Sequence, residues 1–240
     1  MNGEIVAMIP ARIGSTRLRM KNLALIGGKP MIAWAIEAAR ESGAFDRVVV
    51  NADHALFGDI AGRYGAEFYL RPETLGSSTA KSDDVVADFM AAHPAEAVAW
   101  VNSIAPLQPA EEIRDVVDHF RAAKLDSLIT VERKQVHCLF GDDPVNFSFG
   151  GKFAQTQDLA PVLPFVYSVM MWRTEPFLVD MEKQGFAFFC GKFGAYPVGR
   201  LSSLIVKTDE DLLVCDAIAR ARAAGEWSLD YDPLAETAHG

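Results

Sequence analysis

The sequence predicts an α/β protein built on a doubly wound, mostly parallel sheet, and two observations support this prediction. Short apolar segments alternate with helical segments along residues 4–132, at the spacing of consecutive βαβ units. The apolar segments also lack a regular alternation of apolar and polar residues, as expected for strands that helices cover on both faces. In folds of this class, ligands bind beyond the carboxyl ends of the strands.

The elements follow one another in a clear order. Strands are predicted at residues 4–9, 47–51, 67–70, 97–102 and 127–132, and helices at 31–40, 56–64, 82–92 and 111–123. Pro30 is favourable at the start of the first helix. Further strands are predicted at 165–172, 186–189 and 195–198. A closing helix is predicted at 209–224, with Thr208 as its N-cap and Gly225 as its stop.

The segment 133–164 interrupts this pattern. It has little periodicity and carries Gly, Asp, Asn and Phe in turn-like clusters, so it is predicted to be an inserted arm, with a hairpin as one possibility. Otherwise residues 1–240 are predicted to form a single domain, because 240 residues suit one large α/β unit.

The composition excludes several classes of protein. A hydrophobic fraction of 50% and a charged fraction of 23% are ordinary for a globular protein, and a net charge of −9 argues against nucleic-acid binding. No apolar segment approaches the roughly 20 residues needed to cross a bilayer. The start of the chain has no signal-peptide pattern, and Cys138, Cys190 and Cys215 lack zinc-like or disulfide-like spacing. These features predict a cytoplasmic protein.

The most informative local feature is the loop after the first strand, Ala11–Asn22, which reads ARIGSTRLRMKN. It contains Arg12, Arg17, Arg19 and Lys21, together with Gly14 and the hydroxyls of Ser15 and Thr16. Fixed cations and backbone amides are what a polyphosphate requires. The loop has neither the Walker spacing nor the dinucleotide GxGxxG spacing. It is therefore predicted to bind phosphates, with a solvated basic loop as the alternative.

This loop resembles the N-terminal signature of sugar-acid cytidylyltransferases. The likeness continues through LALIGGKP, VVVNADHALFGDIAGRYGAEFYLRPETL, STAKSDDVV, VNSIAPLQPAEEI and FFCGKFGAYPVGRLSSLIVKTDEDL, and so spans about residues 4–213. The pattern is similar to that of acylneuraminate cytidylyltransferases (CMP-N-acetylneuraminate synthetases) and, around Ser15–Leu18, to that of Kdo cytidylyltransferases. It implies a Rossmann-type, three-layer fold like that of nucleotide-diphospho-sugar transferases.

The resemblance also implies roles for individual residues. It assigns nucleotide binding to Arg12, Gly14, Ser15, Arg17, Lys21, Asn22, Arg71 and Ser82. Arg12 and Lys21 are also expected to be catalytic through their charge. Arg71 could instead form a loop salt bridge, Ser82 could cap a helix, and Asp84 is as well explained by a structural hydrogen bond. Sugar binding is assigned to Asn102, Gln157, Phe188 and Phe189, although an aromatic pair more often belongs to a core.

The positions that correspond to the family's metal-binding aspartates depart from the family pattern. The resemblance implies Mg²⁺, but the aspartates that hold it in the family align with Ile205 and Lys207. Three explanations are open. Lys207 could supply positive charge in place of the metal; Asp53, Asp209 or Asp211 could supply a carboxylate; or the protein could bind its ligands without efficient transfer. Asp209 and Asp211 are more simply explained as acids in the first turn of a helix.

The function implied is transfer of CMP from CTP to a nonulosonic-type sugar acid with release of pyrophosphate, as in polysaccharide biosynthesis. The alternatives are a nucleotidyltransferase for another base or sugar, and a catalytically weakened nucleotide- or sugar-binding paralogue. The resemblance also implies a homodimer in which the arm, with Val136, Leu139, Phe140, Phe147 and Phe149, reaches the partner. A solvated surface loop is the alternative for the arm.

Overall fold

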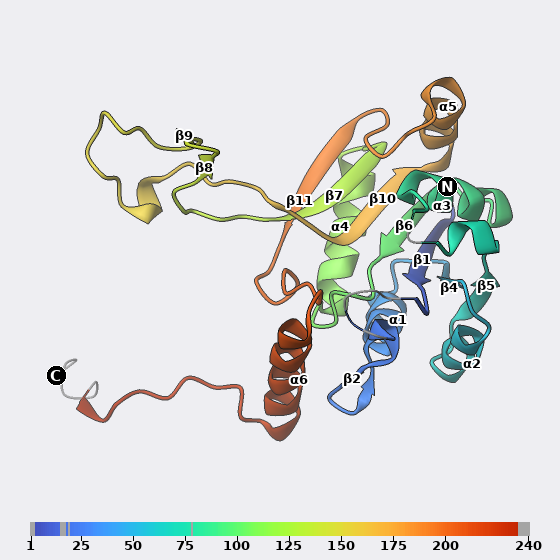
Figure 1. Cartoon of the computed structure of the whole chain (residues 1–240), viewed down its shortest axis with the longest axis horizontal. Coiled ribbons are helices and arrows are strands. Elements are labelled where there is room, and N and C mark those ends of the chain that lie inside the picture. The colour runs from blue at the N-terminus through green and yellow to red at the C-terminus, as the bar shows by residue number, and fades with distance from the viewer. Residues whose placement is uncertain (1–2, 15–17, 19, 78, 235–240) are drawn as a thin grey trace.

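The computed structural model describes residues 3–14, 18, 20–77 and 79–234. Its centre is a 7-stranded sheet in the order β11-β7-β10-β6-β1-β4-β5, shown in Figure 1. The strands are β1 (Ile5–Ala11), β4 (Arg47–Ala52), β5 (Glu67–Leu70), β6 (Ala97–Val101), β7 (Ser127–Glu132), β10 (Phe165–Arg173) and β11 (Phe193–Val198). Only β10 runs antiparallel to its neighbours, β6 and β7, so the predicted mostly parallel sheet is confirmed.

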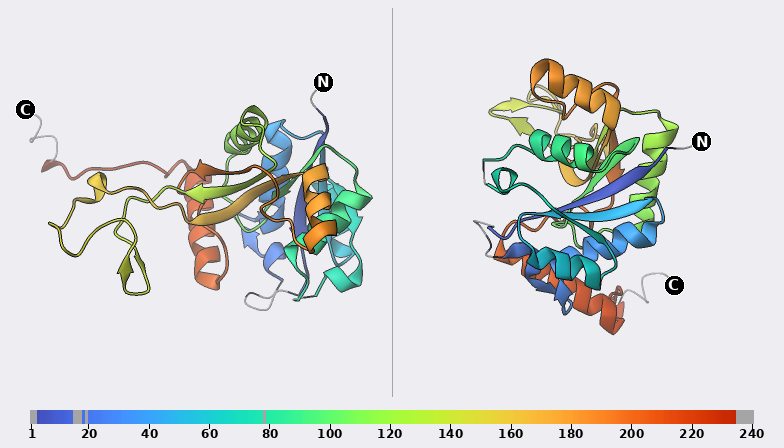
Figure 2. Two further views of the ribbon diagram at one scale, coloured as in Figure 1. Left: turned by 90° about the horizontal axis from the view of Figure 1, so that it is seen from above. Right: turned by 90° about the vertical axis from the view of Figure 1, so that its right-hand side faces the viewer.

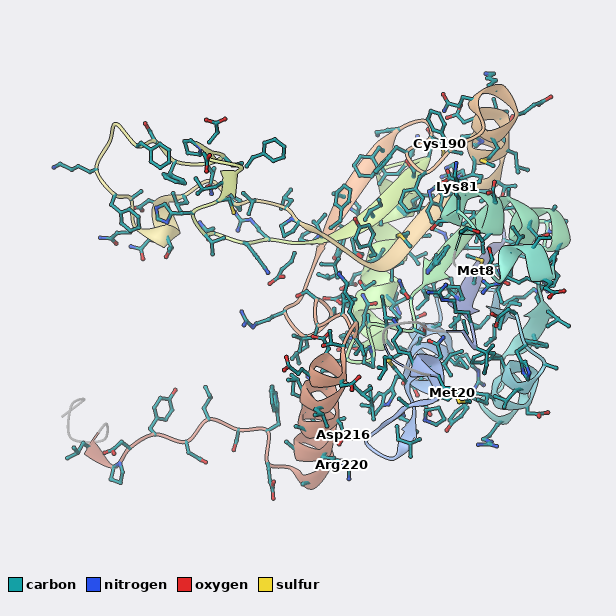
Figure 3. The ribbon with its side chains drawn as sticks, in the orientation of Figure 1. Met8, Met20, Lys81, Cys190, Asp216 and Arg220 are labelled. Atoms are coloured by element: carbon teal, nitrogen blue, oxygen red, sulfur yellow. The ribbon has the colours of Figure 1, made fainter. Side chains whose placement is uncertain are left out.

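Helices cover both faces of the sheet, which gives the predicted three layers (Figure 2). One face, which includes Ile5, Ala7 and Ile9, packs against α1 (Met31–Ser42), α2 (Leu56–Arg63) and α4 (Ala110–Ala122). The other face, which includes Val6 and Met8, packs against α3 (Ser82–Ala92) and α5 (Thr174–Gln184); Met8 is labelled in Figure 3. Burial on both faces explains why the strands are continuously apolar.

The chain reverses its direction of winding at β1. It runs outward from β1 through β4 to β5, and then returns to place β6 on the other side of β1. The loops that leave the carboxyl ends of β1 and β6 therefore diverge and leave a crevice between them. This topological switch point determines where a ligand site can form.

The last helix, α6 (Asp209–Ala224), packs away from the main sheet against the small hairpin of β2 (Leu25–Ile26) and β3 (Lys29–Pro30). Ile26, Met31, Val206, Cys215 and Ala219 form a separate buried cluster there. The Asp216 carboxylate accepts a 2.7 Å hydrogen bond from the Gly27 amide and pairs with Arg220 one turn later (Figure 3). These contacts hold the middle of α6 against the β2–β3 hairpin.

The segment 133–164 extends away from the sheet as an arm, as Figure 1 shows. It contains a hairpin of β8 (Leu139–Phe140) and β9 (Asp143–Pro144), which confirms the predicted hairpin. The Asn146 side chain holds the arm together, because it accepts from the Cys138 amide and donates to the carbonyls of Val136 and Ala160.

In the part of the chain after the arm, one prediction was wrong and one helix was missed. Residues 186–189 form a turn rather than a strand, because the Asp83 carboxylate accepts hydrogen bonds from the Ala187 and Phe188 amides at 2.7 and 3.0 Å. Helix α5 was not predicted at all. Phe177 is its only buried residue, so the segment lacks the apolar periodicity that indicates a helix.

The remaining boundaries agree with prediction to within two residues, and the predicted caps of the last helix are confirmed. Thr208 is the N-cap of α6, where it forms a capping box with Asp211, and Gly225 ends the helix with φ of 73°. All three cysteines are free thiols. None of the helices in the described ranges is long and apolar enough to span a membrane.

Candidate functional site

A cavity of about 410 Å³, here called the central cleft, opens at the switch point. Its walls come from the carboxyl ends of β1 and β6, the loop after β1, the segment from the end of β5 into α3, and Lys207 shortly before α6. The charged side chains that line it are Arg12, Lys21, Arg71 and Lys207. No aspartate or glutamate is among the described residues that line it. In a protein of net charge −9, the central cleft is thus a concentrated positive site.

Arg71 is the most buried of these cations, with 7% of its surface exposed. One of its Nη atoms donates a 2.7 Å hydrogen bond to the Ala11 carbonyl, whereas its buried Nε has no partner in the described structure. Burial lowers the pKa of the guanidinium; the nearby Asp53 carboxylate opposes this shift and Arg12 adds to it. Among the described residues, Arg71 forms no ion pair within 4.0 Å, so the predicted alternative of a loop salt bridge is not seen there.

Asn22 lines the central cleft, but its amide group is used within the protein. Its Nδ2 donates to the Arg12 carbonyl at 3.3 Å, and its Oδ1 accepts from the Ser103 hydroxyl at 2.8 Å. Asn22 is buried, with 4% exposed. It therefore joins the loop after β1 to the end of β6. Ser103, which the sequence reasoning missed, is the other half of this link; its place directly after a buried strand was the available signal.

Lys21 and Lys207 come together from distant parts of the chain. The Lys21 ammonium donates to the Val206 carbonyl at 3.3 Å, and the Val206 amide donates to the Ile104 carbonyl at 2.9 Å. The amide of the next residue, Lys207, donates to the Asp211 carboxylate at 2.8 Å. The segment before α6 is therefore held on both sides while the Lys207 side chain lines the central cleft.

The opposite wall of the central cleft is less charged. Ser82, the first residue of α3, lines it and makes no capping hydrogen bond, because Lys81 is the N-cap position. Trp100 on β6 also lines it, and its buried indole N–H has no partner in the described structure. Unpaired donors are costly when buried, so Trp100 and Arg71 both leave hydrogen-bonding capacity for a ligand. Nothing in the sequence distinguished Trp100 from a core aromatic residue.

Asn102 lines the central cleft but is anchored within the protein. Its Nδ2 donates to the Tyr167 carbonyl at 3.1 Å, and its Oδ1 accepts from the Ile104 amide at 3.4 Å. Tyr167 has a positive φ of 61°, an uncommon backbone conformation for a bulky residue. Asn102 thus supports an irregular, strained stretch of β10, where the pairing register with β7 shifts.

A second cavity of about 460 Å³, the side cavity, lies next to the central cleft between the base of the arm and the start of α6. Lys207 lines both cavities. Phe165 and Tyr167 form an aromatic wall of the side cavity, and the Phe165 ring lies 6.2 Å from that of Phe189. The two cavities therefore meet at one lysine, Lys207.

Comparison with known proteins places this geometry in a family. The sequence profile described as Cytidylyltransferase matches residues 6–144, which include the loop after β1 and the carboxyl ends of β1, β5 and β6. The chain belongs to the cytidylyltransferase family. The central cleft is thus the cleft of a cytidylyltransferase fold, and its basic loop is part of the matched region.

Individual relatives agree with this assignment. The chain is 40% identical to the N-acylneuraminate cytidylyltransferase of Escherichia coli O18:K1:H7 over 125 residues, which are 52% of this chain and 29% of that protein. It is 28% identical to the N-acylneuraminate cytidylyltransferase of Streptococcus agalactiae serotype V over 217 residues, 87% of this chain and 51% of that one. The chain therefore spans about half or less of the length of these relatives.

Solved structures agree on the fold. A CMP:2-keto-3-deoxy-manno-octonic acid synthetase, solved with CTP, superposes with a TM-score of 0.64 over 93% of this chain and 99% of that one. At 18% identity, this likeness supports the shared fold of the cytidylyltransferase family and no more.

Several predicted site residues of this family member lie elsewhere or cannot be placed. Ser15 and Arg17, with Thr16 and Arg19, fall outside the described residues. Gly14 is exposed and does not line either cavity. Asp84 is also exposed, and its neighbour Asp83 makes the structural hydrogen bonds considered for it.

The predicted sugar-side residues are not brought together within one chain. Gln157 lies in the arm, where it donates to Gln155 and its carbonyl accepts from Gln135. The carbonyl of Phe188 accepts from the Trp172 indole, and Phe188 packs on that buried ring, so it belongs to the core. Phe189 is 56% exposed and contacts Phe165 and Phe193. None of these three side chains lines the central cleft.

The carboxylates considered for Mg²⁺ are poorly placed for it. Asp53 accepts the Ile13 amide at 2.9 Å, and Asp211 accepts the amides of Lys207 and Thr208 at 2.8 Å each. Asp209 is an exposed acid in the first turn of α6, and none of the three lines the central cleft. No cluster of three or more potential ligands occurs in the described part of the chain. Mg²⁺ usually takes one or two carboxylates, so these residues do not fit it.

Replacing Asp211 with alanine is expected to destabilise the protein by about 1 kcal/mol, because half of a capping box is lost. Burial raises the pKa of this carboxyl, but hydrogen bonds from Lys207 and Thr208 outweigh burial and leave the pKa below its ordinary value. A lowered folded-state pKa stabilises the protein above the unfolded-state value of about 3.9, and this stabilisation is lost as the pH falls through the folded-state pKa. Urea unfolding of both proteins from pH 7 towards pH 3 measures the difference.

The same experiment separates capping from metal binding. If Asp211 acts only as a cap, adding Mg²⁺ leaves the stability difference between the two proteins unchanged. A Mg²⁺-dependent stabilisation of the wild-type protein that the Asp211→Ala variant lacks would contradict the capping assignment.

Proposed function

We propose that this protein transfers CMP from CTP to a sugar acid and releases pyrophosphate. The observation that carries the proposal is the central cleft, in which Arg12, Lys21, Arg71 and Lys207 converge at the switch point of a cytidylyltransferase fold. Named relatives that act on N-acylneuraminate support the sugar-acid class of acceptor.

In this proposal, the triphosphate lies against the loop after β1. Arg12, Lys21 and Lys207 supply charge, and Asn22 positions the loop through Ser103. The cytidine lies towards the wall formed by Arg71, Ser82 and Trp100, where unpaired donors face acceptor atoms of the base and ribose. Such a site favours transfer by positioning the reactants and stabilising charge.

The acceptor enters from the side cavity. Its carboxylate faces Lys207, and its ring lies along the aromatic wall of Phe165 and Tyr167. The acceptor hydroxyl oxygen forms a bond to the α-phosphorus as the bond to the bridging oxygen of pyrophosphate breaks, and the hydroxyl proton passes to solvent. Cations around the phosphates stabilise the charge that develops on the leaving group.

Pyrophosphate release measures this activity directly. The protein is incubated with CTP and a panel of sugar acids, including nonulosonic acids and Kdo, and mass spectrometry identifies a CMP-sugar. UTP, GTP and ATP in place of CTP test the choice of base. CTP binding without turnover on any acceptor would favour the catalytically weakened paralogue, and turnover with another nucleotide would favour a different nucleotidyltransferase.

We further propose that the arm contacts a second copy of this chain, so that the protein works as a homodimer in the cytoplasm. Phe140 and Phe153 are 84% and 85% exposed although they are large and apolar. The ring of Phe153 also stacks on His137 at 4.3 Å, which holds this surface in a defined shape. An apolar surface of this kind is typical of an interface.

Replacing Phe140 and Phe153 together with serine is expected to convert dimers to monomers, because the apolar surface that a partner covers is lost. Light scattering at several concentrations measures the mass. Leu229→Ser, which alters an exposed apolar residue outside the arm, is the matched control. A wild-type mass that is monomeric at all concentrations would reject the dimer.

A further inference from the structure

The central cleft is not built to hold a divalent metal ion, because of the charges that line it and the contacts that the nearby acids make. Four cationic side chains line the cleft, and the described residues that line it include no carboxylate. The candidate acids outside its lining are already engaged by backbone amides, Asp53 by Ile13 and Asp211, which lines the side cavity, by Lys207 and Thr208. The donor set is that of an anion site rather than a metal site.

We propose that Lys207 supplies, as a fixed side-chain charge, the positive charge beside the phosphates, so that CTP binds to this protein without a metal ion held by its carboxylates. This inference rests on the proposed binding of CTP in the central cleft. It goes beyond that proposal because it assigns the electrostatic role to a residue of this chain.

The position of Lys207 suits this role for two reasons. It is the only charged residue that the described linings of the central cleft and the side cavity share, so its ammonium can face both the nucleotide and the acceptor. Its backbone is also fixed, because its amide donates to Asp211 and the preceding Val206 is bonded to Ile104 and Lys21.

One lysine is enough to complete the positive charge around the phosphates. Arg12, Lys21 and Arg71 already neutralise much of the charge of a polyphosphate. A divalent ion brought into this positive cleft would be repelled by these side chains and would find no carboxylate there to offset the repulsion. The lysine ammonium provides a compact point charge that phosphate oxygens can bind directly.

Isothermal titration calorimetry of the full chain with CTP, once in EDTA and once in excess Mg²⁺, tests the inference. Wild-type affinity is expected to differ by less than threefold between the two conditions. Lys207→Ala is expected to weaken binding by about 10- to 100-fold in both conditions, as for the loss of a hydrogen bond to a charged group. Lys207→Arg keeps the charge and is expected to retain most of the affinity.

Lys192→Ala is the matched control, because the Lys192 ammonium donates to the Ala123 carbonyl and lines neither cavity. This control is expected to bind CTP like the wild type, and thermal melting checks that every variant is folded. Wild-type binding that Mg²⁺ tightens more than tenfold would overturn the inference but leave the proposed function standing. Unchanged affinity in Lys207→Ala, or a loss in Lys207→Arg as large as in Lys207→Ala, would also overturn it. Absence of CTP binding in both conditions would instead reject the proposed function.

Discussion

Replacing Arg71 with methionine is expected to weaken CTP binding by about 10- to 100-fold, because a hydrogen bond to a charged group contributes about 1.5–3 kcal/mol. The guanidinium is nearly buried, is anchored by one bond to the Ala11 carbonyl and keeps an unpaired Nε. It is therefore held in place before a ligand arrives, and preorganised groups lose little entropy on binding. Calorimetric titration of CTP measures the effect.

Stability behaves differently from affinity in this variant. Burial lowers the pKa of Arg71, which shows that the folded protein holds this charge at a cost. Methionine fills a similar volume without a charge, so the free energy of unfolding is expected to fall by less than about 1.5 kcal/mol. Arg71→Lys is the informative companion, because lysine keeps the charge but not the planar donors. Normal CTP affinity in Arg71→Met would show that Arg71 has only a structural role.

Replacing Trp172 with alanine is expected to give the largest loss of stability, about 3–5 kcal/mol, the range for deleting a large buried aromatic side chain. Trp172 is fully buried on β10, its indole donates to the Phe188 carbonyl at 2.9 Å, and its ring contacts Phe177 and Phe188. It therefore attaches both α5 and the turn at residues 186–189 to the sheet. Urea unfolding measures the loss.

A matched variant isolates the hydrogen bond. Trp172→Phe keeps most of the buried ring and loses the indole donor, so its destabilisation is expected to be smaller than that of Trp172→Ala. If the two variants were equally destabilised, the packing contribution of the ring would be negligible and the assignment of Trp172 to the core would be wrong.

The sequence predicted the sheet and its helices well because their signals are local. Apolar segments of strand length and helical segments with caps alternate, and Thr208 and Gly225 mark the limits of α6. The turn at 186–189 could not be predicted, because Asp83, about a hundred positions earlier in the chain, fixes its amides. Helix α5 could not be predicted for a different reason. Phe177 is its only buried residue, so its sequence shows no apolar face.

In the central cleft too, some residues could be predicted from local sequence and others depend on contacts formed by folding. The cations of the loop after β1 were identified from composition and resemblance, and the described ones, Arg12 and Lys21, line the central cleft together with Arg71 and Ser82. The structural roles of Asn22 and Asn102 could not be predicted from the sequence. Their amides bind the protein itself, through Ser103 and Tyr167, and such pairings depend on how loops meet after folding.

The contact between Lys21 and Val206 joins the early and the late parts of the polypeptide. During synthesis the ribosome delivers β1 and its basic loop long before residues 206–211. The strands can thus begin to pair while the cleft still lacks one side. Lys207 can join Arg12, Lys21 and Arg71 in the cleft only after almost the whole chain has been synthesised, so the cleft lacks one of its four cations until the final helix docks.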